Sequence, residues 1–183
     1  GPRGPGPTPW RGHGRGAGIC GRGMAAMNGF RSPPLSRRLA ALYCVFTRLV
    51  DRLQPLLALG LRLYVARVFF MSGLTKIHDW SVTIALFTDE YHVPVLPPGA
   101  AALMGTAVEL SMPVLLALGL ATRVSALVLF LFNIVAVVSY ASLPDVAIKD
   151  HYLWGVLILL VLVFGPGWLS VDAYLKRRYS KRA

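Results

Sequence analysis

The stretch GTAVELSMPVLLALGLATRVSALVLFLFNIVAVVSY, residues 105–140, decides the fold. It belongs to two long apolar runs, residues 100–120 and 122–143, which meet at the short turn GLATR. Each run reaches about the 20 residues that a helix needs to cross the hydrocarbon core of a bilayer. Unclosed strands cannot span lipid, because their backbone groups would stay unpaired. The stretch therefore predicts two transmembrane helices joined by a tight turn.

Two further apolar runs flank this pair, at about residues 56–77 and 152–169. The chain has 55% hydrophobic and 15% charged residues, whereas about a quarter of the residues in a soluble domain are charged. Its mean hydropathy of +0.58 points the same way. The sequence predicts an all-α polytopic membrane protein, with an antiparallel bundle of four transmembrane helices in residues 55–175.

The chain before the first predicted span divides into two parts. Residues 1–34 are rich in Gly, Pro and Arg and have too few apolar residues to offset the entropy of ordering, so we expect a disordered extension. Residues 35–54 place apolar residues at helical spacing, with arginines on the other face, which predicts a basic amphipathic helix that ends at Pro55. Such a helix lies in the headgroup plane or packs on the bundle, and both interpretations stay open.

The distribution of Lys and Arg predicts the orientation of the spans. Nine arginines precede the first span, Arg123 lies in the turn between the second and third spans, and residues 176–183 form a basic tail. In the other two connections, residues 78–99 and 144–151, the charged residues are mainly acidic. Because basic residues are retained on the cytoplasmic side, we expect both termini in the cytoplasm.

Charged residues at membrane depth form the first group of candidate site residues, because charge is costly there. Glu109 lies near the middle of the second span, and Arg67 lies near the middle of the first. Arg62, close to the inner end of the first span, is the alternative partner for Glu109. With Lys76 at the outer end, these residues are candidates for a buried polar pair or a ligand site, although a pair that only fixes helix packing is also compatible with the pattern.

A second group of candidates lies at the predicted outer ends of the helices. It consists of His78, Asp79, His92, Asp150 and His151. His and carboxylate side chains suit divalent transition metals or proton transfer, but an ordinary aromatic belt with polar neighbours explains the same residues. Asn133 and Tyr140, seven residues apart on the third span, are expected to be interhelical hydrogen-bonding residues rather than ligands.

Several motifs are absent from the sequence. It contains no Walker loop, HExxH, CxxCH or nucleophile elbow, so it does not predict a stand-alone enzyme or a firm metal site. The net charge of +11 would suggest nucleic acid, but the basic residues lie at the two ends of the chain and spare its apolar middle. The expected partners are the lipid bilayer and proteins of a membrane complex, with a homo-oligomer as an alternative.

The segments LRLYVARVFFMSGLTKIHDW (61–80), GTAVELSMPVLLALGLATR (105–123) and GPGWLSVDAYL (165–175) resemble the DoxX family of small four-helix membrane proteins. The positions that carry the resemblance are Arg62, Gly73, Lys76, Glu109, Gly119 and Arg123. The segments LFTDEYHVPVLPP (86–98), FNIVAVVSY (132–140) and HYLWGVLILL (151–160) are closer to the bacterial subgroup encoded beside metal-induced modified peptides. The resemblance implies a four-helix bundle in a bacterial cytoplasmic (inner) membrane.

For function, the resemblance implies a link to membrane redox chemistry, because relatives are subunits of thiosulfate:quinone oxidoreductases. The first hypothesis is an accessory or subunit of a redox or sulfur-handling system, with a quinone near Arg62, Arg67, Lys76 and Glu109. The second is a membrane accessory for metal stress or a peptide metallophore, with His78, His92 and His151 facing the outer compartment. The third is a structural anchor without activity. Apart from the quinone, no cofactor is evident.

Overall fold

The computed structural model describes residues 34–93, 95–140 and 143–179. The expected disordered extension lies outside the described residues except for Pro34, and so does the end of the basic tail. The chain divides into two compact units, residues 1–53 and 54–183. The second unit contains every predicted transmembrane run and is the one that positions the candidate site.

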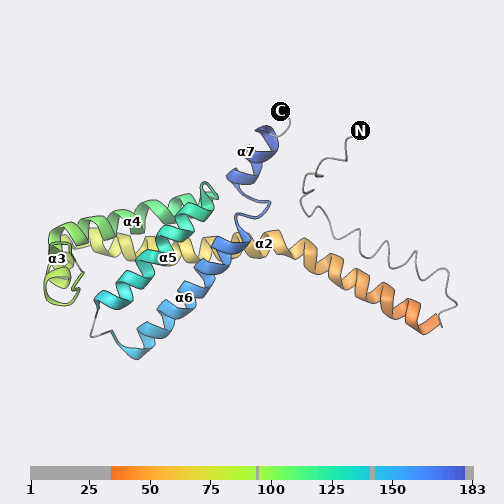
Figure 1. Ribbon diagram of the computed structural model, residues 1–183, viewed down its shortest axis with the longest axis horizontal. Coiled ribbons are helices and arrows are strands. Elements are labelled where there is room, and N and C mark those ends of the chain that lie inside the picture. The colour runs from red at the N-terminus through yellow and green to blue at the C-terminus, as the bar shows by residue number, and fades with distance from the viewer. Residues whose placement is uncertain (1–33, 94, 141–142, 180–183) are drawn as a thin grey trace, which may run out of the picture. The chain divides into compact units, whose positions relative to one another are not determined.

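The described part of the chain contains four helices that are long and apolar enough to cross a membrane. They are α2 (Pro34–His78), α4 (Pro98–Leu118), α5 (Thr122–Ser139) and α6 (Asp145–Phe164) (Figure 1). Two short helices, α3 (Trp80–Asp89) and α7 (Val171–Tyr179), complete the described structure. The predicted all-α fold with four transmembrane helices is therefore confirmed, and the first connection, expected to be a loop, contains α3.

The prediction that a helix ends at Pro55 was wrong. Helix α2 runs without interruption from Pro34 to His78, with Pro55 inside it. Proline removes one backbone donor and crowds the preceding turn, but helices in a membrane tolerate it when neighbouring groups re-satisfy the backbone. In the first unit, the apolar side chains of the amphipathic segment, including Leu42 and Phe46, are exposed.

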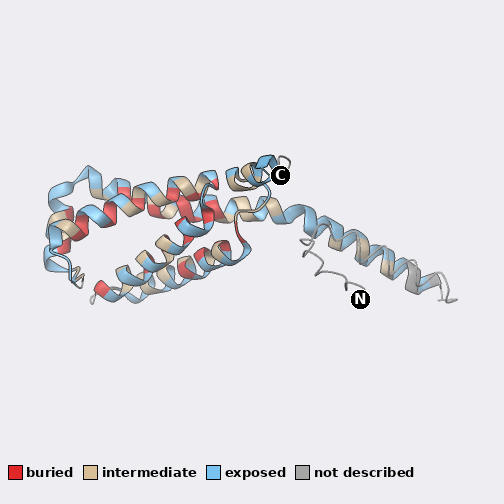
Figure 2. Cartoon of the chain, turned by 45° about the horizontal axis from the view of Figure 1, so that its top comes forward, coloured by how far each residue is buried: buried red, intermediate tan, exposed pale blue. Residues whose placement is uncertain are grey.

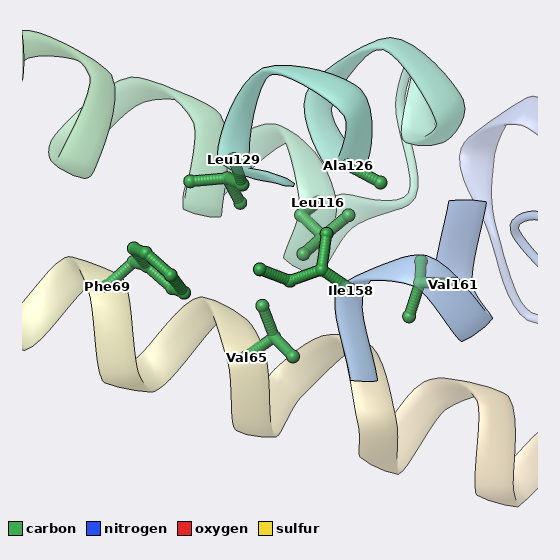
Figure 3. Close-up of a cluster of buried hydrophobic side chains, with 7 residues drawn as sticks. All are labelled: Val65, Phe69, Leu116, Ala126, Leu129, Ile158 and Val161. Atoms are coloured by element: carbon green, nitrogen blue, oxygen red, sulfur yellow. The ribbon is translucent and has the colours of Figure 1, made fainter. Parts of the chain in front are cut away.

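The core of the second unit joins four helices. It is built by Val65 and Phe69 of α2, Leu116 of α4, Ala126 and Leu129 of α5, and Ile158 and Val161 of α6. Figure 3 shows these side chains pointing toward one another, and Figure 2 shows buried residues along the facing sides of these helices. Because lipid tails are as apolar as leucine, close packing rather than water exclusion holds such helices together.

Backbone conformation fixes the turn between α4 and α5. Gly119 ends α4 with φ of 71°, and Ala121 precedes α5 with φ of 47°. Both values are left-handed, a region that glycine adopts freely and other residues only at a cost. A side chain at position 119 would overlap the Arg62 guanidinium and Ser170. The turn therefore needs glycine for its conformation and also for the space that Arg62 occupies.

Candidate functional site

A buried ion pair links Lys76, in the last turn of α2, to Glu109, near the middle of α4. The Lys76 ammonium lies 2.6 Å from Glu109 Oε2 and donates to Oε1 at 2.8 Å. Ser72, one turn before Lys76, donates to Glu109 Oε1 at 3.0 Å and accepts from Lys76 at 3.0 Å. The side chains of Lys76 and Glu109 are 14% and 5% exposed. Because each charge has its partner within hydrogen-bond distance, both can remain ionised away from water.

Gly73 brings the two helices close enough for this pair to form. A Cβ at position 73 would lie 3.0 Å from the Glu109 Cβ and 3.0 Å from the Leu110 side chain, so any larger residue would require these neighbours to move by a few tenths of an ångström. Small residues at helix contacts allow this kind of approach in membranes. Gly73 thus permits the helix contact, and Ser72 and Lys76 supply the hydrogen bonds to the Glu109 carboxylate.

The structure does not pair Glu109 with either arginine, contrary to the sequence-based expectation. Arg67 is exposed, because it lies two residues, or about 200° of helix rotation, away from the buried Phe69. Arg62 lies on the buried face but eleven residues before Gly73, which is roughly 16 Å along the helix axis. Lys76 lies three residues after Gly73, on the face of α2 that contacts α4 and at the same depth as Glu109.

A cavity of about 440 Å³ lies beside this ion pair. Ser72, Lys76 and Glu109 contribute polar atoms to its wall, and most other lining residues are apolar or aromatic. The aromatic residues of the wall are Phe69, Phe87, Tyr91, Phe132 and Trp154. A mainly apolar cavity with a few convergent polar groups is the usual form of a small-molecule site.

Ring contacts between different helices position the aromatic residues of the cavity wall. Phe69 of α2 meets the rings of Phe132 and Trp154 edge-on, at centroid distances of 6.4 and 6.0 Å. After α3, Tyr91 stacks on Phe87 at 4.9 Å and contacts Tyr140 at 4.8 Å. Burial, followed by the charge of Glu109, raises the pKa of Tyr91 to about 12, so its phenol stays protonated beside the cavity.

His151 of α6 lines the same cavity and is held in place by Asn133 of α5. Asn133 donates from Nδ2 to the His151 carbonyl at 3.0 Å, and its Oδ1 lies 2.8 Å from His151 Nδ1. Gly155, one turn after His151, leaves room for the amide, because a Cβ there would lie 3.3 Å from Asn133 Nδ2. The other predicted packing residue, Tyr140, makes a ring contact with Tyr91.

The structure does not bring the five outer-end candidates together. Asp79 caps the first turn of α3 by accepting from the Val82 amide at 3.1 Å, and this bond, with one from Ser81, lowers the pKa of Asp79. His92 Nδ1 lies 3.1 Å from the Glu90 carbonyl oxygen and donates to it in the tautomer that carries the proton on Nδ1. His78 and Asp150 are exposed. In the ranges that the structure describes, no three His, Cys, Asp or Glu side chains are grouped to hold a metal ion.

A second polar cluster, not foreseen from the sequence, joins the turn before α5 to α7. Asp172 accepts from the amides of Ala121 and Thr122, each at 2.9 Å, and from the Thr122 hydroxyl at 2.9 Å. Burial raises the pKa of Asp172, but these hydrogen bonds outweigh burial and leave it below the ordinary value. The buried Arg62 donates to the Leu169 carbonyl and adds a favourable charge near Asp172. This cluster fixes the end of the bundle and does not line the cavity.

Comparison with known proteins gives one family. No curated protein and no solved structure matches the chain. A model of the DoxX family matches residues 57–142, a range that contains the Ser72, Lys76 and Glu109 cluster, the close contact at Gly73 and the turn at Gly119. The match confirms the resemblance seen in the sequence and identifies residues 57–142 of this membrane protein as its DoxX-family region.

Proposed function

We propose that this protein is a membrane subunit or accessory of a quinone-linked redox system, and that the quinone ring binds in the cavity beside Lys76 and Glu109. One observation carries the proposal: the cavity is lined on one side by a buried ion pair and on another by apolar residues that are exposed on the outer surface of the helices. A lipid-soluble molecule with a polar ring and an apolar tail matches both features.

The tail would enter from the lipid between α4 and α5. Met104 of α4 and Leu131 and Val135 of α5 line the cavity, yet they are also exposed large hydrophobic residues. Since α4 and α5 are membrane-spanning helices, exposed apolar residues on them meet lipid tails. This arrangement favours a ligand that partitions into the bilayer over one that arrives from water.

The ring would bind at the polar wall. Two of the three Lys76 hydrogen bonds go to the same carboxylate, and that carboxylate also accepts from Ser72. Lys76 can therefore turn one N–H toward a carbonyl oxygen of the ligand without leaving Glu109 unpaired. The aromatic rings of Phe69, Phe132 and Trp154 offer edge-to-face or stacked contact to a planar ring.

A subunit role fits better than a stand-alone enzyme, because the sequence lacks a motif for a second redox group. The charge distribution supports an orientation with both termini in the cytoplasm, and the resemblance to the bacterial subgroup favours a bacterial cytoplasmic membrane. A role in metal stress has less support, since the described His and carboxylate residues do not form a three-ligand group. If the protein were purely a structural anchor, no ligand would bind in the cavity.

The proposal can be tested by measuring quinone binding to a variant in which a bulky side chain blocks the entrance of the cavity. The purified protein in lipid nanodiscs would be dialysed to equilibrium against a short-chain benzoquinone, and bound quinone would be measured by chromatography. We expect saturable binding that Met104→Trp weakens at least tenfold, because the indole fills the entrance. Leu103→Trp is the matched control: the neighbouring residue is 63% exposed and does not line the cavity. No saturable binding by the unmodified protein, or equal binding by the two variants, would contradict the proposal.

A further inference from the structure

The cavity has a second polar side, which the proposed function does not use. Lys76 and Glu109 belong to α2 and α4, whereas Ser139 and His151 belong to α5 and α6 and line the same cavity. Ser139 is 3% exposed, and its hydroxyl has no hydrogen-bond partner among the described residues. Buried polar groups without a partner are uncommon, and one that borders a cavity points to a ligand that supplies the missing bond.

The hydrogen bonds of His151 determine what its ring can offer. Asn133 Nδ2 must face the His151 carbonyl, because a carbonyl can only accept. The atom of Asn133 that faces the imidazole is therefore Oδ1, an acceptor, so His151 Nδ1 must carry the proton in this contact. In the uncharged ring, Nε2 is then an acceptor, and no described residue donates to it.

The walls of the cavity thus differ in chemistry. The α2 and α4 side carries the Lys76 ammonium, which donates, and the α5 and α6 side carries His151 Nε2, which accepts. We propose that the cavity binds a ring with oxygen functions at two positions, and that the reduced, quinol form is held by a hydroxyl that donates to His151 Nε2, while Ser139 supplies a further hydrogen bond to the ligand. This inference rests on the proposed function and specifies which redox form of its ligand the site prefers.

The preference follows from the number of hydrogen bonds that each form can make. A quinol hydroxyl donates to His151 Nε2 and accepts from Lys76 through its other oxygen. The oxidised quinone has carbonyl oxygens only, so it can accept from Lys76 but leaves His151 Nε2 without a donor. One hydrogen bond lost in a buried site corresponds to about a tenfold change in affinity.

Ligand analogues test the inference without any substitution. The protein in nanodiscs would be titrated anaerobically with a short-chain benzoquinol, the matching benzoquinone and the dimethyl ether of the quinol. We expect the quinol to bind about tenfold more tightly than the ether, which cannot donate, and more tightly than the quinone. If the quinone binds but the quinol and its ether bind equally, the inference is overturned while the proposed function stands. If none of the three binds, the proposed function has failed as well.

Two variants locate the effect. His151→Phe keeps an aromatic ring beside Trp154 but removes Nε2 together with the Nδ1 contact to Asn133, and Ser139→Ala removes a hydroxyl that has no hydrogen-bond partner among the described residues. His151→Phe should weaken quinol binding about tenfold while leaving quinone binding within twofold, whereas Ser139→Ala should weaken the binding of both forms, because a hydroxyl can donate to a quinone carbonyl as well as accept from a quinol. Ser125→Ala, on the same helix but outside the cavity lining, is the control and should bind as the unmodified protein does. Unchanged quinol binding by His151→Phe would overturn the inference, and the comparison of the quinol with its dimethyl ether decides it if His151→Phe does not fold.

Discussion

Removal of the Glu109 carboxylate tests how the ion pair contributes to the bundle. The carboxylate accepts two hydrogen bonds from Lys76 and one from Ser72, and its side chain is 5% exposed. In Glu109→Ala the ammonium would keep only the Ser72 hydroxyl, which cannot neutralise its charge. Loss of one partner from a buried pair costs about 3–5 kcal/mol, whereas replacement of both charges by apolar residues is often neutral.

These figures give a quantitative expectation. Glu109→Ala should lower the free energy of unfolding by about 3 kcal/mol or more, which corresponds to a Tm decrease on the order of 10 °C for a chain of this size. The double variant Lys76→Met with Glu109→Leu should recover most of that loss, because it leaves no unpaired charge. The coupling between the two positions would then exceed about 2 kcal/mol.

Thermal unfolding in nanodiscs, followed by tryptophan emission, provides the measurement. Ser111→Ala is the control, since Ser111 is an exposed residue of α4 that bonds only to the Ala107 carbonyl of its own helix. Its Tm should stay close to that of the unmodified protein. The prediction is refuted if Glu109→Ala unfolds at the unmodified temperature, or if the destabilisation of the double variant equals the sum of those measured for Lys76→Met and Glu109→Leu singly.

Three further predictions concern the surroundings of the site. Gly73→Ala should lower stability by about 1–3 kcal/mol in the same unfolding assay, because its Cβ would lie 3.0 Å from side chains of α4; unchanged stability would exclude the close helix contact. Asp172→Asn should cost about 0.5–2 kcal/mol at neutral pH through the weakened cap of α5. Since the pKa of Asp172 is lowered, its contribution is present above the unfolded value near 3.8 and is lost as pH falls through the folded value, so unfolding curves of the two proteins should converge in acid. Tyr91 has a raised pKa of about 12, so the unmodified protein should lose stability relative to Tyr91→Phe as pH rises from 10.0 through about 12, and parallel curves would contradict its burial.

The transmembrane helices could be predicted because lipid leaves the backbone few alternatives. A run as apolar as residues 122–143 must pair its own backbone groups, and helix is the form in which a single segment does so. The ends of these helices were harder to predict. Proline ends helices in water more reliably than in a membrane, and Pro55 lies inside α2. The α3 segment, Trp80–Asp89, was assigned to the polar connection, although Asp79 is a good N-cap residue directly before it.

The candidate site was predictable in part. The need of Glu109 for a cation followed from its depth in the second span, but the identity of that cation depends on helix rotation and relative depth, which one sequence does not specify. Gly73 was the available signal, because a small residue marks where the neighbouring helix approaches and Lys76 follows it by one turn. Asp172 was missed because it caps α5 rather than its own helix, and Ala121 offers no side-chain cap there.

The most direct test of the cavity is to locate a bound quinone. A photoreactive azido-benzoquinone with a short tail would be irradiated with the protein in nanodiscs, and the labelled peptides would be mapped by mass spectrometry. The account predicts labels on cavity-lining residues of α2, α4 and α6, suppressed by excess unlabelled quinone and by Met104→Trp. Labels confined to lipid-facing residues such as Leu103 and Val138, or labelling that unlabelled quinone does not suppress, would contradict it.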